Sequence, residues 1–284
     1  TGIPFREVQV RKSIWFDGRE YRLPDIRFTN MYSRKVADGY FDRSIVNLET
    51  VRRWIAPEDF HVRMLKKCNG RIKFGQKIKG IDKDWIIVQH GPEDGVDEAP
   101  IRRQGPVIST IAMPIMAKVL GLPSPVSFQA GKKVYVFRYR IARANLNLSM
   151  YYPSPETPVY RASVMRDVLA VETVESELKK VSASDGEAAG RYIAEVLQSL
   201  GIDSRDVEYL DEGSQLGKIS YNLDERTRKN WIFRLTNDYW IYSLGRFAIW
   251  KNILQDDVYE DVQKIRGYIE SGTHYDFYRE SAKA

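Results

Sequence analysis

The residues best suited to bind an anionic ligand lie in one stretch near the C-terminal end, from Leu244 through Gly245-Arg246-Phe247 to Trp250. A glycine lets the backbone approach a ligand closely, and an arginine can pair with a phosphate or a carboxylate. We expect this stretch to open the last helix, over 248–269, where unpaired N–H groups and a partial positive charge favour an anion. The pattern predicts a binding site for a phosphorylated or electron-rich group.

Other common chemistries lack the residues they need. The three histidines, His61, His90 and His274, lie far apart, and no Cys or His pair has metal-ligand spacing, so no metal site is expected. There is no Gly-x-Ser-x-Gly elbow and no Walker loop. The single cysteine, Cys68, is expected to be a packed or incidental thiol. It excludes an intramolecular disulfide, which fits a cytoplasmic location.

Three segments, in order along the chain, resemble the FAD-dependent oxidoreductases of the UDP-galactopyranose mutase and amine-oxidase group, to which the protoporphyrinogen oxidase-like enzymes belong. Residues 29–36 are similar to the Asn-x-Tyr-x-x-Lys-Val segment of that group. Residues 71–82 and 107–114 together are similar to the later half of its FAD domain. Residues 241–252, followed by an acidic pair, resemble its closing Gly-Arg-φ-Ala-x-Tyr/Trp stretch.

The resemblance implies that FAD is the cofactor, that a strand edge near Ile78 offers backbone groups to the adenine end, and that a Ser-Thr turn returns towards the cofactor. The residues that would contact the cofactor are Ile78, Ser109, Thr110, Pro114, Leu244, Gly245, Arg246, Phe247 and Trp250. A fourth match, at 158–163, implies that Arg161 grips an anionic substrate. The residues that would contact the substrate are Tyr32, Lys35, Tyr160 and Arg161.

No catalytic side chain is assigned, because in flavin enzymes the cofactor performs the chemistry and the protein orients it. The defining Gly-x-Gly-x-x-Gly turn of the group, which cradles the pyrophosphate, occurs nowhere in the 284 residues. We therefore expect the chain to be an N-terminally incomplete fragment of a longer product. As given, it is expected to bind FAD poorly or not at all and to be inactive.

Hydrophobic periodicity and turn residues predict the elements that position these residues. We expect a hairpin over 8–23, helices over 42–55 and 57–67, strands within 71–82, 85–90 and 106–111, and a helix over 115–120. Further on we expect one long strand over 133–150, another strand over 160–171, a helix over 186–200, a loop over 203–218, and helices over 225–239 and 248–269.

The predicted fold class is α/β. The resemblance implies a three-layer (ββα) FAD-binding domain, incomplete at its N-terminus, built from 69–125 and 236–284, and an inserted α+β substrate domain built from 1–68 and 126–235. With 43% hydrophobic residues the chain can bury a substantial core. No apolar stretch approaches the ~20 residues that cross a bilayer, so no membrane association is expected.

The implied reaction is either hydride-transfer oxidation of an amine or alcohol, or a redox-neutral sugar isomerisation on reduced flavin, acting on a small-molecule or nucleotide-linked substrate. The formal net charge of +6 permits attraction to nucleic acid without indicating it. The rival is a non-catalytic or nucleic-acid-binding protein whose aromatic and Arg residues, from Tyr135 to Arg143, stack on bases. A hybrid is an oxidase acting on a nucleotide-linked amine. The sequence does not indicate the oligomeric state.

Overall fold

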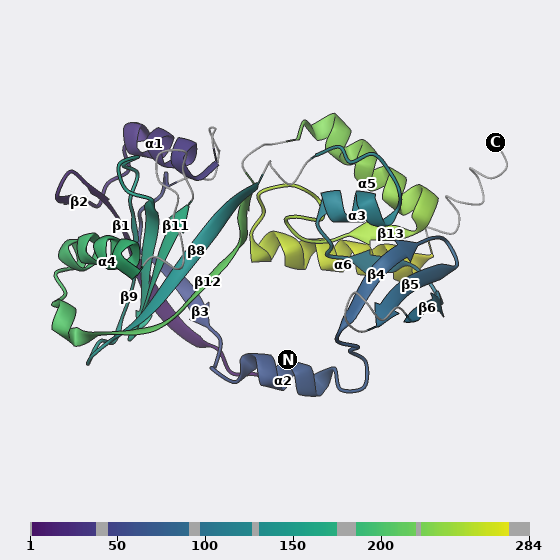
Figure 1. Cartoon of the computed structure of the whole chain (residues 1–284), viewed down its shortest axis with the longest axis horizontal. Coiled ribbons are helices and arrows are strands. Elements are labelled where there is room, and N and C mark those ends of the chain that lie inside the picture. Colours follow the sequence, from purple (N-terminus) through teal and green to yellow (C-terminus); the bar gives the residue numbers. More distant parts are fainter. Residues whose placement is uncertain are drawn as a thin grey trace. The chain divides into compact units, whose positions relative to one another are not determined.

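The computed structural model describes residues 2–37, 45–90, 97–126, 131–174, 186–219 and 223–272 (Figure 1). The chain folds into two compact units. The first comprises 1–67 with 131–221, and the second comprises 68–130 with 222–284. Each unit therefore combines segments that are distant in the sequence. The assignment of flavin and substrate roles to these parts of the chain stays a prediction.

The first unit is built on a large, mostly antiparallel sheet. Its strand order is β12-β8-β11-β10-β9-β1-β2, with β3 also paired to β1, and the pairing of β1 with β9 is parallel. The strands are β1 (Arg6–Phe16), β2 (Arg19–Tyr21), β3 (Val51–Ile55), β8 (Gly131–Ile141), β9 (Leu146–Tyr151), β10 (Val159–Arg166), β11 (Val168–Val174) and β12 (Val207–Ile219). The predicted hairpin over 8–23 is confirmed by β1 and β2.

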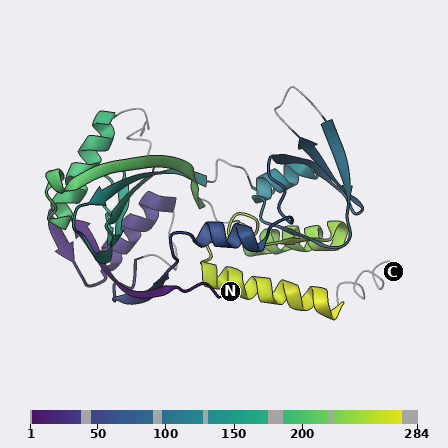
Figure 2. The ribbon, with the colours of Figure 1, turned by 90° about the horizontal axis from the view of Figure 1, so that it is seen from below.

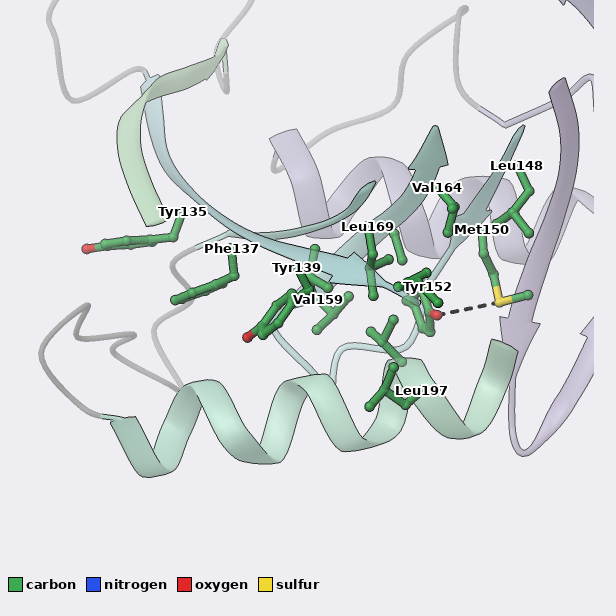
Figure 3. Packing of buried hydrophobic residues seen from close by; sticks show 14 residues of the cluster. Tyr135, Phe137, Tyr139, Leu148, Met150, Tyr152, Val159, Val164, Leu169 and Leu197 are labelled. Carbon is green, nitrogen blue, oxygen red and sulfur yellow. Dashed lines mark hydrogen bonds between the residues drawn. The ribbon is translucent and has the colours of Figure 1, made fainter. Parts of the chain in front are cut away.

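Both faces of this sheet are apolar. Successive side chains of a strand point to opposite faces, so a single strand contributes residues to both. From β8, Tyr135, Phe137 and Tyr139 pack with helix α4 (Gly186–Leu200), whereas Val134 packs with helix α1 (Ile26–Ala37). Figure 3 shows the aromatic rings of β8 above α4. In the same cluster the hydroxyl of Tyr152 donates to the sulfur of Met150 at 3.4 Å. A buried strand of this kind is positioned by helices on both sides.

Residues 51–55 form strand β3, so the helix predicted over 42–55 is wrong. β3 pairs antiparallel with β1, residues 45–50 contain no helix, and residues 42–44 lie outside the described ranges. The apolar residues that suggested a helix over 42–55 are apolar for two unrelated reasons. Ile45 and Leu48 are buried in the cluster beneath α1, whereas Trp54 is 63% exposed on the strand. Helix α2 (Phe60–Lys67) then follows, as predicted.

Residues 207–219 form strand β12, although a loop was predicted over 203–218. A short 3₁₀ turn, Ser204–Asp206, precedes the strand. Two acidic residues of β12 pair with arginines of β8: Asp211 with Arg138 at 2.5 Å, and Glu208 with Arg140 at 3.2 Å. An edge strand that is held by backbone bonds and exposed ion pairs lacks apolar alternation, which is why its composition resembles that of a loop.

The described residues of the second unit form an antiparallel three-stranded sheet, a parallel strand pair and three helices. Figure 2 gives a second view of the ribbon. Arg103, after the last strand of the sheet, donates to the carbonyl oxygens of Tyr239 at 2.8 Å and Trp240 at 3.1 Å, which fixes the start of β13. The elements are β4 (Gln76–Ile81), β5 (Trp85–His90), β6 (Asp97–Arg102), β7 (Val107–Ser109), α3 (Met113–Val119), α5 (Glu225–Tyr239), β13 (Ile241–Ser243) and α6 (Gln255–Ser271). Strand β13 lies in a segment for which the sequence predicted only a connection.

No helix within the described ranges is both long and apolar enough to cross a membrane.

Candidate functional site

The turn at Ser109 and the stretch that begins at Leu244 lie side by side in the second unit. Strands β7 and β13 pair in parallel, with Ser243 opposite Ser109. The N–H of Leu244 donates to the carbonyl oxygen of Ser109 at 2.9 Å, and the N–H of Met113 donates to that of Phe247 at 2.9 Å. Two segments that are far apart in the sequence therefore end at one place.

The chain turns sharply at Gly245, whose φ of +91° favours glycine. Its carbonyl oxygen accepts the N–H groups of Ala248 at 3.1 Å and Ile249 at 3.0 Å. Trp250, which is 1% exposed, anchors the end of the turn in the core. A Cβ added to Gly245 would meet no heavy atom within 4 Å. Open space therefore lies directly beside the backbone of this glycine.

Several polar groups of these two segments have no hydrogen-bond partner among the described residues. Within the described ranges the backbone N–H groups of Gly245 and Phe247 are unpaired. Thr110 is exposed, and no partner of its hydroxyl is found in the same ranges. By contrast, the hydroxyl of Ser109 accepts the N–H of Ile111 at 3.2 Å and so shapes the turn. Unpaired donors beside open space can bind the acceptor atoms of a ligand.

Helix α6 begins at Gln255, so the prediction that the glycine-arginine stretch opens the last helix is wrong. Trp250 has a φ of +49°, a left-handed conformation that cannot continue a right-handed helix. The helix is capped by its own acid, because Asp257 Oδ2 accepts the N–H of Leu254 at 2.8 Å. Arg246 donates to the carbonyl oxygen of Ile253 at 2.9 Å. This arginine therefore ties the turn to the residues that lead into α6.

Ile78 and Pro114 lie on neighbouring elements of the same unit. Ile78 of β4 lies opposite Val88 of β5. The pairing of these two strands shifts between Ile78 and Gly80 through a bulge. Pro114 is buried in the first turn of α3, which contacts β4. A bulge leaves a strand residue without its ladder partner, so backbone groups beside Ile78 can face a ligand.

The four residues predicted to contact a substrate lie together in the first unit, where α1 meets β10. The rings of Tyr32 and Tyr160 are 6.3 Å apart. The Lys35 ammonium donates to three backbone carbonyl oxygens, those of Tyr152 at 2.8 Å, Ser154 at 2.7 Å and Val159 at 2.5 Å. Lys35 therefore holds the loop between β9 and β10.

Arg161 lies opposite Glu172 on the neighbouring strand and forms a two-point ion pair with it. Nη2 donates to Oε1 at 2.5 Å and Nε donates to Oε2 at 3.1 Å, while the Tyr160 hydroxyl also donates to this carboxylate. Burial raises the pKa of the Tyr160 hydroxyl above its usual range, and the Glu172 charge adds to this. Burial opposes the charge of Arg161, but Glu172 outweighs it and raises the pKa of the guanidinium.

Glu172 was not predicted as a site residue, although the sequence contained a signal for it. Once 159–174 is treated as a hairpin that turns at Arg166, Arg161 and Glu172 face each other across the strands, where opposite charges attract. The Lys35 ammonium, the Tyr160 hydroxyl and the Arg161 guanidinium thus bind protein groups. A role in substrate binding, which stays a prediction for these residues, would require Arg161 to exchange Glu172 for a substrate anion.

The described ranges also contain no group of three His, Cys, Asp or Glu side chains placed to hold a metal ion. Neither protein-family models nor curated protein sequences match the chain.

Solved structures do resemble it. The CLA-producing fatty acid isomerase from P. acnes superimposes with a TM-score of 0.56 at 9% identity, over 92% of this chain and 80% of that one. Reduced UDP-galactopyranose mutase gives a TM-score of 0.49 at 16% identity, over 68% and 45%. Aklavinone-11 hydroxylase, in complex with FAD and aklavinone, gives a TM-score of 0.44 at 9% identity, over 84% of this chain and 43% of that one. The chain thus spans less than half the length of the mutase and the hydroxylase. The likeness to the isomerase shows a shared fold.

Proposed function

We propose that this chain is part of an FAD-dependent enzyme and that the isoalloxazine ring lies along the stretch from Leu244 to Trp250, beside the turn at Thr110. The observation that carries the proposal is the pairing of these two segments through β7 and β13. The flavoprotein resemblance requires the two segments to be adjacent. Two segments so far apart in the sequence would not otherwise be expected to meet. The fold shared with the isomerase supports the architecture, and at 9% identity it supports no particular reaction.

The residues at this place suit a planar heteroaromatic ring. Gly245 has no side chain, and the space beside it is open. The unpaired N–H groups of Gly245 and Phe247 can donate to ring carbonyl oxygens, and Thr110 offers a hydroxyl from the other strand. Trp250 is locked in the core and keeps the turn rigid. A bound flavin would supply hydride transfer or nucleophilic attack, while these protein groups bind and orient it.

The proposal covers two reaction types. One is oxidation of an amine or alcohol, in which electrons leave the substrate for good. The other is a redox-neutral isomerisation on reduced flavin. A single-turnover experiment with the flavin-loaded enzyme distinguishes them: oxidation bleaches the oxidised flavin absorbance without oxygen, and isomerisation requires prior reduction.

Nucleic-acid binding gains no support from the strand that suggested it. Tyr135, Phe137 and Tyr139 are buried in the core of the first unit and cannot stack on bases. The intervening arginines Arg138 and Arg140 pair with acids of β12. Packing and ion pairing account for this pattern, so we propose no second function.

Riboflavin and FAD titrations test the flavin proposal. Because the chain contains no glycine-rich pyrophosphate turn, we expect both ligands to bind weakly and with similar affinity. Gly245→Val should weaken riboflavin binding by at least about tenfold, because its branched side chain would fill the space beside the turn. Gly272→Val is the matched control, since Gly272 also has a positive φ and open surroundings but ends α6. Equal loss of riboflavin binding in both variants, or riboflavin binding that Gly245→Val leaves unchanged, would refute the proposal.

A further inference from the structure

A turn at the start of the second unit exposes two large apolar side chains to water. Residues 68–75 form this turn and connect helix α2 to strand β4 (Figure 1). Within it Phe74 is 75% exposed and Ile72 is 41% exposed. A single exposed apolar residue needs no explanation, but two that flank one lysine form an exposed apolar patch.

The surroundings of the turn are open at both of its ends. Gly70 and Gly75 both have a positive φ, +74° and +68°, which favours glycine. A Cβ added to either glycine would meet no heavy atom within 4 Å. The N–H of Arg71 donates to the carbonyl oxygen of Cys68 at 2.9 Å, so the backbone closes the first part of the turn itself. The side chains between the two glycines are therefore accessible to a large partner.

Basic residues alternate with the apolar ones. Arg71 and Lys73 are exposed on either side of Ile72, and Lys79 is exposed on β4. None of these three basic side chains forms an ion pair or a hydrogen bond with another described residue. The chain contains 38 acidic residues, yet none of them lies within 60–81. The turn therefore has an excess of positive charge that its own segment does not neutralise.

The charges and the apolar side chains together suit an anionic lipid surface. Such a surface attracts Lys and Arg, and it accepts apolar side chains into the boundary beneath its headgroups. Nucleic acid would attract the same charges, but an aliphatic side chain such as Ile72 cannot stack on a base. A free anion would neutralise the basic residues and leave Phe74 in water. Binding at a surface also needs no spanning segment, and the lack of one was the only argument in the sequence against membrane association.

We propose that residues 71–74 bind the surface of an anionic phospholipid membrane. Ile72 and Phe74 insert beneath the headgroups, while Arg71, Lys73 and Lys79 pair with lipid phosphates. Neither contribution is strong alone, because stable attachment to a membrane surface generally takes two signals. The proposal concerns residues that the flavin proposal does not use.

Flotation of the full chain with lipid vesicles tests the contribution of charge. We compare vesicles of phosphatidylglycerol mixed with phosphatidylcholine against vesicles of phosphatidylcholine alone. We expect binding to the anionic vesicles only, decreasing as salt is added, because salt screens the attraction. Arg71→Gln combined with Lys73→Gln should weaken binding by at least about tenfold. Arg226→Gln combined with Lys229→Gln is the matched control, since it removes the same charge from α5.

Phe74 variants test the apolar contribution. Phe74→Ser should weaken binding to the anionic vesicles by about tenfold, whereas Phe74→Leu should retain it, because insertion requires an apolar side chain but not an aromatic one. Tyr259→Ser is the matched control: Tyr259 is 66% exposed but lies on α6. Circular dichroism shows whether each variant keeps its fold.

Four results would overturn the proposal. They are no binding to anionic vesicles, equal binding to neutral vesicles, binding that Phe74→Ser leaves unchanged, and binding to a DNA duplex that displaces the vesicles and is lost in Phe74→Leu. The last result would assign the turn to base stacking instead. No flavin is added in these measurements, so their outcome leaves the flavin proposal untouched.

Discussion

At the scale of single residues, the polar side chains that the sequence marked for substrate binding serve the architecture of the first unit. The Lys35 ammonium donates to three carbonyl oxygens, two in the loop between β9 and β10 and one at the start of β10. The Arg161 guanidinium satisfies Glu172, which also receives the Tyr160 hydroxyl. A charged group half buried in the protein needs such partners, because the alternative is an unpaired group shielded from water.

Lys35→Met should destabilise the protein by roughly 2–4 kcal/mol, because three carbonyl oxygens lose a charged donor. Urea denaturation monitored by circular dichroism measures the change. Lys12→Met is the control, because the Lys12 ammonium donates to only one exposed carbonyl oxygen in the described ranges, that of Asn47, at 3.2 Å. This substitution should lower the free energy of unfolding by less than about 1 kcal/mol. If Lys35→Met were as stable as the parent, the loop-holding role would be ruled out and substrate binding would gain weight.

Residue types were predictable here, whereas their partners were not. From the sequence alone, Lys35 and Arg161 suit an anionic substrate as well as they suit a partner within the protein. What decides their surroundings is the β10–β11 register, which sets Glu172 opposite Arg161, and the loop that brings three carbonyls to Lys35. The register follows only once 159–174 is recognised as a hairpin, and the pattern around Lys35 does not indicate the loop that it binds.

At the scale of elements, the glycine at 245 determines how β13 leads into the segment before α6. Its φ of +91° lies outside the region that side chains tolerate well, although no atom obstructs a Cβ. The cost of a substitution is therefore one of backbone conformation rather than of collision.

Gly245→Ala should destabilise the protein by about 2 kcal/mol through this strain. Gly267→Ala should change the stability in the opposite direction, because Gly267 lies inside α6 with open surroundings. Alanine there should stabilise the protein by up to about 1 kcal/mol. Thermal and urea unfolding of the two variants compare them directly. Two variants of equal stability would contradict the assigned conformations.

Strongly periodic elements were predictable, and edge or short strands were not. The helices over 186–200 and 225–239 were expected and are present, because one apolar stripe or a clear N-cap defines each. Strand β12 is held by backbone pairing and exposed ion pairs, and β13 has only three residues. Pairing partners from distant segments decide such strands, and local hydrophobicity carries little of that information.

At the scale of the whole molecule, buried tyrosines govern the response to alkaline pH. Burial raises the pKa of Tyr139 to about 12, and it raises the pKa values of Tyr32, Tyr151, Tyr152 and Tyr160 as well. In the unfolded chain these groups ionise near pH 10. Since the folded-state values are higher, stability is fully present below about pH 10 and declines as the pH rises above it.

We expect part of the tyrosine absorbance change at 295 nm to appear only when the far-ultraviolet circular dichroism is lost, above about pH 10. A single titration of all tyrosines near their ordinary pKa, with the secondary structure intact, would contradict the buried network.

Hydrogen exchange by mass spectrometry, with and without riboflavin at its solubility limit, tests the central claim most directly. If the isoalloxazine ring lies on the turn after β13, protection should appear in peptides that contain Gly245 and Phe247 and in those that contain Thr110. Protection confined to other segments, or no change at these amides while riboflavin is bound, would contradict the account.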